Sequence, residues 1–311
     1  MLMLVTGGAG FIGSHLVDAL VAEGHDVRVL DNLATGNRDN LRYSPKVEFV
    51  RGDIRDLEMV QRSAEGVSVV FHQAALPSVP RSIADPVSCH DVNATGTFNV
   101  LLAARDAGVR RVVFASSSSV YGNTPELPKR ENMATKPLSP YAAAKLLGEH
   151  YARLFHQLYG LETVGLRYFN VFGPRQNPNS EYAAAIPKFI RLILGGGQPT
   201  IYGDGEQTRD FTPVQNVVSA NLGAAFSPLA PGKVYNVGCG SRISLNTLLS
   251  QIGEVAGREV RPQYLPAKAG DVRDSLADIE AARRDLDYEP RMRIEAALQA
   301  LVAHLASTPA S

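Results

Sequence analysis

The sequence VTGGAGFIGSHL at residues 5–16 decides the fold. An apolar run leads into it, and glycines stand at positions 7, 10 and 13, just before a helical pattern. Gly7 permits a tight turn, Gly10 lets the backbone approach a pyrophosphate, and Gly13 lets the helix pack closely on the strand. Free N–H groups at the start of that helix suit phosphates. The stretch therefore predicts the strand, turn and helix that begin a nucleotide-binding α/β domain.

Asp31 is the acidic residue that such a turn requires. It ends the second expected strand, DVRVLD, at about the distance expected for a ribose ligand. A carboxylate there accepts from the ribose hydroxyls and repels a 2′-phosphate, which favours NAD over NADP. Arg38 is too loosely placed to reverse that preference. A structural turn with an unrelated aspartate is the alternative, and the agreement of context and spacing disfavours it.

Asp53 ends the third expected strand, in VRGDIRD, a position suited to the adenine edge. An aspartate can instead cap the helix that follows such a strand. This alternative fits Asp56 better than Asp53, so Asp53 is expected to contact the cofactor.

Apolar strand-like runs alternate with helical patterns as far as Asn170. The strand-like runs are MLMLVT, DVRVLD, VEFVRGD, SVVFHQAA, RRVVFASSS and LETVGLRYFN. Helices are expected over residues 12–22, around VNATGTFNVLLAARDAG, and over Pro140–Tyr159. Continuous apolar strands between helices predict an α/β fold, a Rossmann-type doubly wound parallel sheet covered on both faces.

Beyond Asn170 the sequence is rich in loops, with modest helices expected at residues 186–194, Leu245–Ala256 and 294–304. KVYNVG has the pattern of one more strand of the main sheet. We therefore expect two interleaved parts. Residues 1–168 with 212–238 would bind NAD, and residues 169–211 with 239–311 would form a smaller α/β lobe for the substrate.

Composition excludes several classes of protein. Lys and Arg together number 31, as do Asp and Glu, so no net field attracts nucleic acid or an anionic membrane. Cys89 and Cys239 lack the spacing of metal ligands or of a disulfide framework. The stretch MLMLVTGGAG does not resemble a secretory leader, and no apolar run is long enough to span a bilayer. We expect a cytoplasmic protein without metal, nucleic-acid or membrane partners.

Tyr141 and Lys145 stand four residues apart in SPYAAAK, on one face of an expected helix. A Lys ammonium beside a phenol stabilises the phenolate and lowers the phenol's pKa from about 10. A tyrosine tuned in this way exchanges protons with a substrate hydroxyl near neutral pH. Such a pair alone is usually a solvated helix face. Its place after a strand that ends in serines, in a chain with a nucleotide turn, favours catalysis.

These motifs together resemble a known superfamily. TGGAGFIGSHL, DNLATG, GDIRD, HQAALPSVPRS, VNATGTFNVL, SSSSVYG, SPYAAAK, LRYFNVFGPRQNPN and YGDGEQTRDF are similar to the extended short-chain dehydrogenases/reductases, and within them to the NAD-dependent UDP-hexose 4-epimerases. The likeness runs from Met1 to about Asp278, in the expected order. It implies transient oxidation of a UDP-sugar at C4 by bound NAD, turning of the 4-keto sugar, and return of hydride to the opposite face.

The resemblance also implies roles in catalysis. Ser117 would supply the catalytic hydroxyl, Tyr141 would be the base, and Lys145 would hold the nicotinamide ribose. Related dehydratases and decarboxylases usually carry a glutamate where this chain has Ser119, with another acid or a serine before it, at Ser118. Without a carboxylate, elimination lacks a base, which favours simple epimerisation.

Two larger sets of contacts follow from the resemblance. The residues expected to contact NAD are Gly7, Gly10, Phe11, Ile12, Gly13, Asp31, Asn32, Gly36, Asp53, Ile54, Gln73, Ala74, Ala75, Asn93, Ser116, Tyr141, Lys145, Tyr168 and Phe169. The residues expected to contact the UDP-sugar are Pro77, Ser78, Ser117, Ser118, Tyr141, Asn170, Ala184, Ala185, Tyr202, Arg209, Lys268, Asp271, Arg273 and Ser275. Phe169 would lie beside the nicotinamide, Asn170 at the diphosphate and sugar, and Tyr202 near the uracil.

The diphosphate contacts carry open alternatives. Arg209 matches a diphosphate arginine of the family, and a surface ion pair with Asp204 or Asp210 is the alternative. Many family members have arginine where this chain has Lys268, so Arg273 is expected to share that work.

Three positions bear on the choice of sugar. A large tyrosine often replaces Ser275 in epimerases restricted to UDP-glucose and UDP-galactose, so a small residue implies room for an acetamido group. Pro77, in place of a glycine of some strict N-acetyl members, argues against this. A missing group costs only about 1–3 kcal/mol, so use of both pairs of sugars is expected. Asn177 stands where the glucuronate epimerases have arginine, which disfavours that acid.

Other functions and the assembly remain open. The alternatives are a dehydratase, decarboxylase or reductase of the same superfamily, and a catalytically silent NAD-sensing or interaction protein. The helices around NATGTFNVLLAARDAG and AAAKLLGEHYARLF carry broad apolar stripes. The family pairs these helices across a homodimer as a four-helix bundle, although both can simply cover their own sheet.

Overall fold

The computed structural model describes residues 1–176, 185–267 and 273–307. Its centre is a seven-stranded parallel sheet in the order β11-β6-β5-β4-β1-β2-β3. The strands are β1 (Leu2–Thr6), β2 (Asp26–Asp31), β3 (Val47–Arg51), β4 (Val69–His72), β5 (Arg111–Ser117), β6 (Glu162–Tyr168) and β11 (Lys233–Val237). This confirms the predicted Rossmann-type sheet, including KVYNVG as its last strand. The winding reverses between β1 and β4, where such sheets bind ligands at their carboxyl ends.

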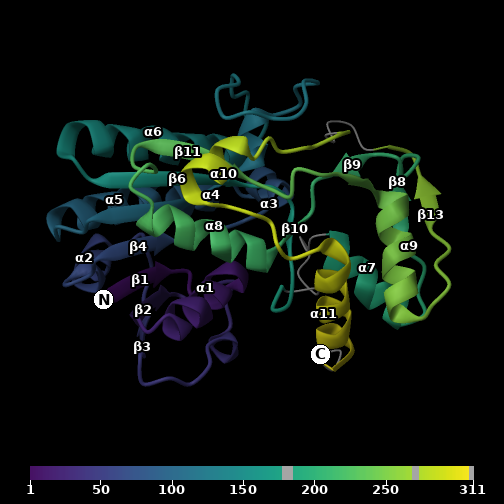
Figure 1. Ribbon diagram of the computed structural model, residues 1–311, viewed down its shortest axis with the longest axis horizontal. Helices are drawn as coiled ribbons and strands as arrows, with labels where there is room; N and C mark the ends of the chain where they lie inside the picture. Colours follow the sequence, from purple (N-terminus) through teal and green to yellow (C-terminus); the bar gives the residue numbers. More distant parts are fainter. Residues whose placement is uncertain (177–184, 268–272, 308–311) are drawn as a thin grey trace.

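Helices cover both faces of this sheet (Figure 1). They are α1 (Phe11–Ala22), α2 (Leu57–Ala64), α3 (Val79–Ala84), α4 (Pro86–His90), α5 (Gly96–Asp106), α6 (Pro140–Tyr159) and α8 (Val214–Phe226). Helices α1 and α8 pack together on one face, and α2, α5 and α6 lie in a row on the other. Among the described helices, none has both the length and the apolar character needed to cross a membrane.

Local sequence signals determine where α6 begins and ends. The Ser139 hydroxyl accepts from the N–H of Ala142, and Pro140 occupies the first helical position. Gly160 follows the helix in the left-handed conformation, with φ of 71°. A serine cap, an N-terminal proline and a C-terminal glycine are the usual boundaries of a helix. They place Tyr141 in the first turn, beside the end of β5.

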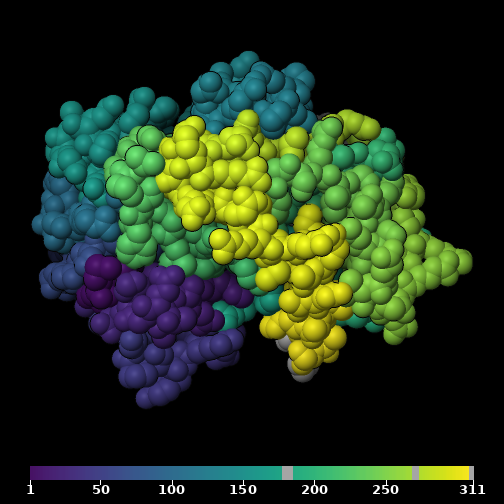
Figure 2. Space-filling view, viewed as in Figure 1, coloured from purple at the N-terminus to yellow at the C-terminus, as the bar shows by residue number. Residues whose placement is uncertain are grey.

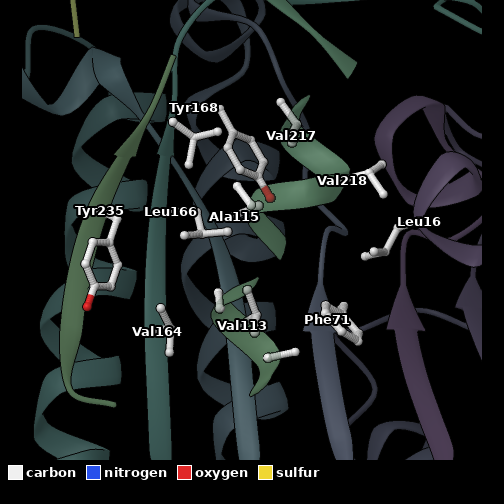
Figure 3. Packing of buried hydrophobic residues seen from close by; sticks show 14 of the residues in the cluster. Leu16, Phe71, Val113, Ala115, Val164, Leu166, Tyr168, Val217, Val218 and Tyr235 are labelled. Carbon is white, nitrogen blue, oxygen red and sulfur yellow. The ribbon is translucent and has the colours of Figure 1, made fainter. Parts of the chain in front are cut away.

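Alternate residues of β5 serve opposite faces of the sheet. Val113 and Ala115 join the core cluster that lies under α8, as Figure 3 shows. Phe114 points the other way, toward α6, so closely that a Cβ on Gly148 would lie 2.7 Å from its ring. Successive serine side chains at the end of this strand are therefore expected to point to opposite faces of the sheet.

The second lobe has its own apolar cluster, made by α7 (Ala185–Leu194), α9 (Leu245–Ala256) and α11 (Ile294–Ser307). Short strand pairs flank it. These are β8 (Thr200–Tyr202) with β13 (Gln263–Leu265), and β9 (Thr208–Arg209) with β12 (Ile243–Ser244). Figure 1 shows this lobe beside the main sheet. A further pair, β7 (Val171–Phe172) with β10 (Thr212–Pro213), lies where the chain passes between the two parts.

One segment differs from the expected division of the chain. Residues 239–311 were assigned to the substrate lobe, but Ala277, Ile279, Tyr288 and parts of α10 (Glu280–Leu286) are buried in the core of the main sheet. The Tyr288 hydroxyl also donates to the Gly238 carbonyl at 2.7 Å. Figure 2 shows yellow C-terminal residues over both parts of the molecule. This segment leaves the lobe because its apolar side chains complete the layer that covers β11.

Candidate active site

The glycine turn is sterically required. Gly7 has φ of +69°, and a Cβ there would lie 2.6 Å from the Ala74 nitrogen. A Cβ on Gly13 would lie 2.2 Å from the Gly7 oxygen. Gly10 precedes α1 without a side-chain cap, and the first turn of α1 carries no acidic residue. The N–H groups of that turn are thus left for an anion, which fits a dinucleotide pyrophosphate.

Asp31 lies at the carboxyl end of β2, next to that turn. Its carboxylate accepts from the N–H groups of Ala9 at 3.0 Å and of Leu33 at 2.8 Å. Burial raises its pKa, and these two hydrogen bonds act in the opposite direction. Gly36 approaches so closely that its Cβ would lie 3.1 Å from Asp31 Oδ2. The turn and the acidic residue that the sequence pairs are therefore adjacent.

Asn32 and Asp53 also come together at this edge. Asn32 Nδ2 donates to Asp53 Oδ2 at 2.8 Å, and Arg55 Nη2 lies 2.8 Å from the same oxygen. The hydrogen bond from Arg55 is the main cause that lowers the pKa of Asp53 to about 2. Asp56 caps α2 by accepting from Met59 N–H, as the alternative reading of this motif expects. Asp53 thus stays an ionised acceptor beside the predicted adenine position.

A buried histidine that was not singled out from the sequence connects β4 to β1 and α5. His72 Nδ1 lies 2.7 Å from Thr6 Oγ1, and His72 Nε2 lies 3.0 Å from Thr97 Oγ1. Thr97 donates its proton to the Asn93 carbonyl, so the imidazole carries its proton on Nε2. Burial, with a smaller effect of Lys145, lowers the pKa of His72 to about 3. The only sequence signal was a histidine at the end of an apolar strand.

The buried side chain of Asn93 holds the backbone of the loop that is predicted to bind the cofactor. Its side chain is 0% exposed. Its amide accepts from Leu76 N–H at 2.8 Å and donates to the Leu76 carbonyl at 3.0 Å. The side chain thus orders the segment that follows Gln73, Ala74 and Ala75, and the expected contact of Asn93 with NAD stays a prediction.

Tyr168 and Phe169 occupy different environments at the end of β6. The Tyr168 hydroxyl bonds Gln73 Nε2 at 3.1 Å and Asn221 Nδ2 at 2.8 Å. Phe169 is 0% exposed, with its ring centroid 6.3 Å from that of Tyr121. The ring of Phe169 therefore belongs to the core, and its expected place beside the nicotinamide stays a prediction.

Tyr141, Lys145 and Glu149 lie one helical turn apart on the side of α6 that meets β5. Lys145 Nζ donates to the Ala115 carbonyl at 2.8 Å and lies 5.9 Å from the centroid of the Tyr141 ring. Burial lowers the pKa of Lys145 to about 8. These contacts bring the predicted pair to the end of the serine-bearing strand.

The expected lowering of the Tyr141 pKa does not occur in the protein alone. Burial raises the pKa of Tyr141 to about 12, and a hydrogen bond with the Ser117 hydroxyl acts in the opposite direction. The expectation was wrong because it counted the charge of Lys145 and left out desolvation, which disfavours a phenolate.

The four serines have separate surroundings. Ser116 points toward α6 and donates to Glu149 Oε1 at 2.5 Å, so its hydroxyl does not line the cofactor pocket as predicted. The Ser117 hydroxyl lies against Ser119 and accepts from the Ser119 N–H at 3.2 Å and from the Ser119 hydroxyl at 2.9 Å. Ser118 and Ser119 begin the short helical turn η3 (Ser118–Tyr121).

Glu149 belongs to a buried polar network that sequence reasoning missed. Arg167 Nη2 lies 2.7 Å from Glu149 Oε2, with both side chains about 5% exposed. Arg167 Nη1 donates to the Tyr121 hydroxyl at 2.8 Å, and that hydroxyl donates to Asn236 Oδ1 at 2.7 Å. The network links α6, β6, η3 and β11 below the candidate site. Its sequence signal was a glutamate one turn beyond Lys145.

The substrate side is built around Asn170, which has φ of +34°. Asn170 Nδ2 donates to the Asp210 carbonyl at 3.0 Å and to Ser275 Oγ at 3.1 Å. The Asp210 carboxylate accepts from the N–H groups of Cys239 at 2.7 Å and Ala277 at 3.1 Å. These contacts hold Asn170 and Ser275 together, although a long stretch of sequence separates them.

Asp204 and Asp210, the carboxylates considered as alternative partners of Arg209, have other partners. Asp204 pairs with Arg273 at 3.1 Å, and Arg209 Nη1 donates to the carbonyls of Thr208 and Arg273, each at 2.9 Å. The Asp210 carboxylate is taken up by backbone N–H groups instead.

The remaining predicted contacts lie on several separate elements. Pro77 is exposed, Ser78 caps α3 with φ of 101°, Tyr202 is 38% exposed on β8, and Ala185 begins α7. Ala184, Lys268, Asp271 and Asn177 lie outside the described residues. Among the residues that the structure describes, no group of three or more His, Cys, Asp or Glu side chains is placed to hold a metal ion.

Comparison with known proteins gives consistent matches. The family described as the NAD dependent epimerase/dehydratase family matches residues 3–238. A UDP-glucose 4-epimerase of Mycolicibacterium smegmatis is 42% identical over 299 residues, covering 94% of this chain and 95% of that protein.

Two solved structures extend the similarity to the whole fold. The UDP-N-acetylglucosamine 4-epimerase from Methanobrevibacter ruminantium, in complex with UDP-N-acetylmuramic acid, matches with a TM-score of 0.94 at 40% identity over 98% of both chains. The UDP-glucose 4-epimerase of Thermus thermophilus, in complex with NAD, matches with a TM-score of 0.90 at 39% identity over 99% of this chain and 100% of that one.

Proposed function

The chain belongs to the NAD dependent epimerase/dehydratase family, and from that membership we propose that it inverts C4 of UDP-hexoses. The substrates would be UDP-glucose and UDP-galactose, together with UDP-GlcNAc and UDP-GalNAc. The observation that carries the proposal is the meeting of Ser117, Tyr141 and Lys145 at the carboxyl end of β5, at a sheet edge that also bears the glycine turn. UDP-glucose and UDP-GlcNAc epimerases among the similar proteins support it.

NAD, when bound, accepts hydride from C4 and returns it. The first turn of α1 would hold its pyrophosphate, and Asp31 would hold the adenosine ribose. Tyr141 removes the proton of the 4-hydroxyl and later returns it. Ser117 hydrogen-bonds the same oxygen, and Lys145 stabilises the phenolate and holds the other ribose. Asn170 and Arg209 would bind the diphosphate, where charge-assisted bonds hold it while the sugar turns.

The surroundings of the serines disfavour dehydration. Elimination needs a carboxylate near the sugar, and residues 116–119 are all serine. The nearest carboxylate on α6, Glu149, is bound to Arg167 and Ser116 on the opposite side of β5. It cannot take a proton from the sugar without breaking a buried ion pair.

Product analysis tests the function. The purified chain is incubated separately with UDP-glucose, UDP-GlcNAc and UDP-glucuronate, and the products are identified by NMR. We expect the 4-epimers of the first two, without net consumption of NAD. A 4-keto-6-deoxy product would favour a dehydratase, and no 4-epimer from any substrate would exclude the proposal.

Ser275 offers a test of sugar choice. Ser275→Tyr places a bulky ring next to Asn170 and fills the space proposed for the acetamido group. We expect kcat/KM for UDP-GlcNAc to fall about 10–200-fold relative to that for UDP-glucose. Ser275→Ala controls for the lost hydroxyl and should change both substrates equally. Equal effects of Ser275→Tyr on both substrates would contradict the pocket assignment.

An apolar surface on α3, α4 and α6 supports a homodimer. Ile83, Val87, Leu158 and Tyr159 are 63%, 69%, 68% and 52% exposed. A hollow between α4 and α6 is lined by Pro86, His90, Pro140, Ala143, Ala144 and Leu147. We propose that a second copy packs its α5 and α6 against the same two helices as a four-helix bundle, and that this surface is covered in the contact.

Leu158→Asp is expected to produce monomers, because it places a charge within that proposed contact. Light scattering coupled to size-exclusion chromatography measures the mass. Leu229→Asp is the control, since Leu229 is 54% exposed and lies outside the helices of the proposed bundle. A wild-type monomer, or a dimer that survives Leu158→Asp, would contradict the proposal.

A further inference from the structure

We infer that Ser119 is a positioning residue that turns the Ser117 hydroxyl into a fixed donor toward the reacting oxygen. The inference rests on the proposed function for the identity of that oxygen. In the sequence, Ser119 stood out only because related dehydratases carry a glutamate at this position.

The inference rests on the hydrogen bonds that the Ser117 hydroxyl accepts. A serine hydroxyl has one proton to donate and two lone pairs that accept. The Ser119 N–H, which can only donate, lies 3.2 Å from Ser117 Oγ. The Ser119 hydroxyl donates to the same oxygen at 2.9 Å. Both accepting positions are therefore filled from one side, and the Ser117 proton is left to point away from Ser119.

The Tyr141 hydroxyl is the partner that we infer for that proton, because the two bonds from Ser119 leave the Ser117 hydroxyl only a donor. The hydrogen bond with Ser117 lowers the pKa of Tyr141 against the larger effect of burial. A hydrogen bond has this effect when it is donated to the phenolate. Since Ser117 has only one proton, donation toward Tyr141 requires that Ser119 is the donor of the bond between the two serines.

The local backbone makes this arrangement specific to residue 119. Ser117 is extended, with φ of −150° and ψ of 145°, and its side chain caps η3 by accepting from Ser119 N–H. Any residue at 119 can keep that backbone bond, but only a hydroxyl donor adds the second bond. A carboxylate at 119 would accept the Ser117 proton and turn it away from the substrate. Ser119 thus keeps the Ser117 hydroxyl as a donor toward the C4 oxygen, and it also takes the place of a carboxylate.

Substitution of Ser119 leaves the other charges around Tyr141 unchanged. Lys145 on α6, Cys89 on α4 and Tyr168 on β6 are the titratable groups that act on or beside Tyr141. His72 on β4 lies near Lys145 and is neutral. The hydrogen bonds that the described residues make to Ser119 come from Ser117 and Gly122 and from none of these groups, so a change in the titration of Tyr141 reports the hydrogen bond from Ser117.

Ser119→Ala is the direct test. We expect kcat with UDP-glucose to fall about tenfold, with KM unchanged, because one hydrogen bond is lost. The acid limb of the pH profile of kcat should move to higher pH by up to about one unit, since the phenolate loses a donor. Ser119→Thr keeps the hydroxyl and should restore both quantities. Bound NAD and the thermal transition should match wild type in both variants.

Two results would overturn the inference. One is a Ser119→Ala variant with wild-type kcat and acid limb. The other is an equal loss in Ser119→Ala and Ser119→Thr, which would indicate packing alone. Ser119→Cys carries a weaker donor, so its kcat and acid limb should lie between those of wild type and Ser119→Ala. If Ser119→Ala fails to fold, Ser119→Cys takes its place in the test.

A second measurement separates this inference from the proposed function. The phenolate absorbance of Tyr141 is titrated as the difference between a chain and its Tyr141→Phe partner, and this needs no turnover. The Tyr141 pKa should be higher in Ser119→Ala than in wild type. If wild type gives no 4-epimer, the proposed function fails while this titration still decides the role of Ser119. Equal values in both chains would exclude that role.

Discussion

Tyr141→Phe is expected to lower kcat for C4 epimerisation by about 10²–10⁴-fold, while the chain keeps its fold and its NAD. The change removes only the hydroxyl that exchanges the proton of the 4-hydroxyl. The phenyl ring still packs in the first turn of α6, and Lys145 keeps its bond to the Ala115 carbonyl. Chemistry should therefore fail without loss of the cofactor site.

Single-turnover and steady-state rates with UDP-glucose measure the loss, and NAD released on denaturation measures retention of the cofactor. Tyr151→Phe is the matched control, since Tyr151 lies on the same helix and its ring packs 5.1 Å from that of Phe98. It should keep wild-type activity. Turnover within about tenfold of wild type in Tyr141→Phe would remove Tyr141 as the base.

Arg167→Met is expected to lower the free energy of unfolding by about 3–5 kcal/mol. It leaves the Glu149 carboxylate buried with only the Ser116 hydroxyl and deprives the Tyr121 hydroxyl of a donor. An uncompensated buried charge is among the costliest single changes in a protein. A loss of this size approaches the whole stability of many domains, about 5–15 kcal/mol.

Urea denaturation gives the comparison. The double variant Glu149→Gln/Arg167→Met should recover part of the lost stability, because the stranded charge is gone. Arg261→Met is the surface control, since the side chains of Arg261 and Glu259 are 79% and 74% exposed. It should change stability little. A single Arg167→Met variant as stable as wild type would show that the buried pair does not hold α6 against β6.

The part of the site that local pattern controls was predictable. Gly7, Gly13 and Asp31 stand at spacings that a strand, a tight turn and a helix impose, and the structure brings them together. The caps of α6 are equally local, and they place Tyr141 and Lys145 one turn apart. Short-range geometry alone decides such features, so one sequence is enough to predict them.

The sequence was less informative where partners distant in the chain decide the outcome. Burial of the Phe169 ring in the core and the bonds of Asn93 to Leu76 depend on such partners. Residues 277–288 lie late in the chain and yet cover β11. Adjacent segments in space, and not neighbours in sequence, determine which side chains remain exposed.

The four serines at residues 116–119 illustrate what the sequence determines and what only the tertiary structure decides. The sequence by itself determined a parallel sheet, a nucleotide turn, a Tyr–Lys pair and a strand end without carboxylates, because periodicity, glycine conformation and residue chemistry are local properties. Only the tertiary structure decided that Ser116 bonds Glu149, that Ser119 donates to Ser117, and that burial raises the pKa of Tyr141. Desolvation and the direction of a proton depend on the atoms packed around a group, and folding alone brings those atoms together.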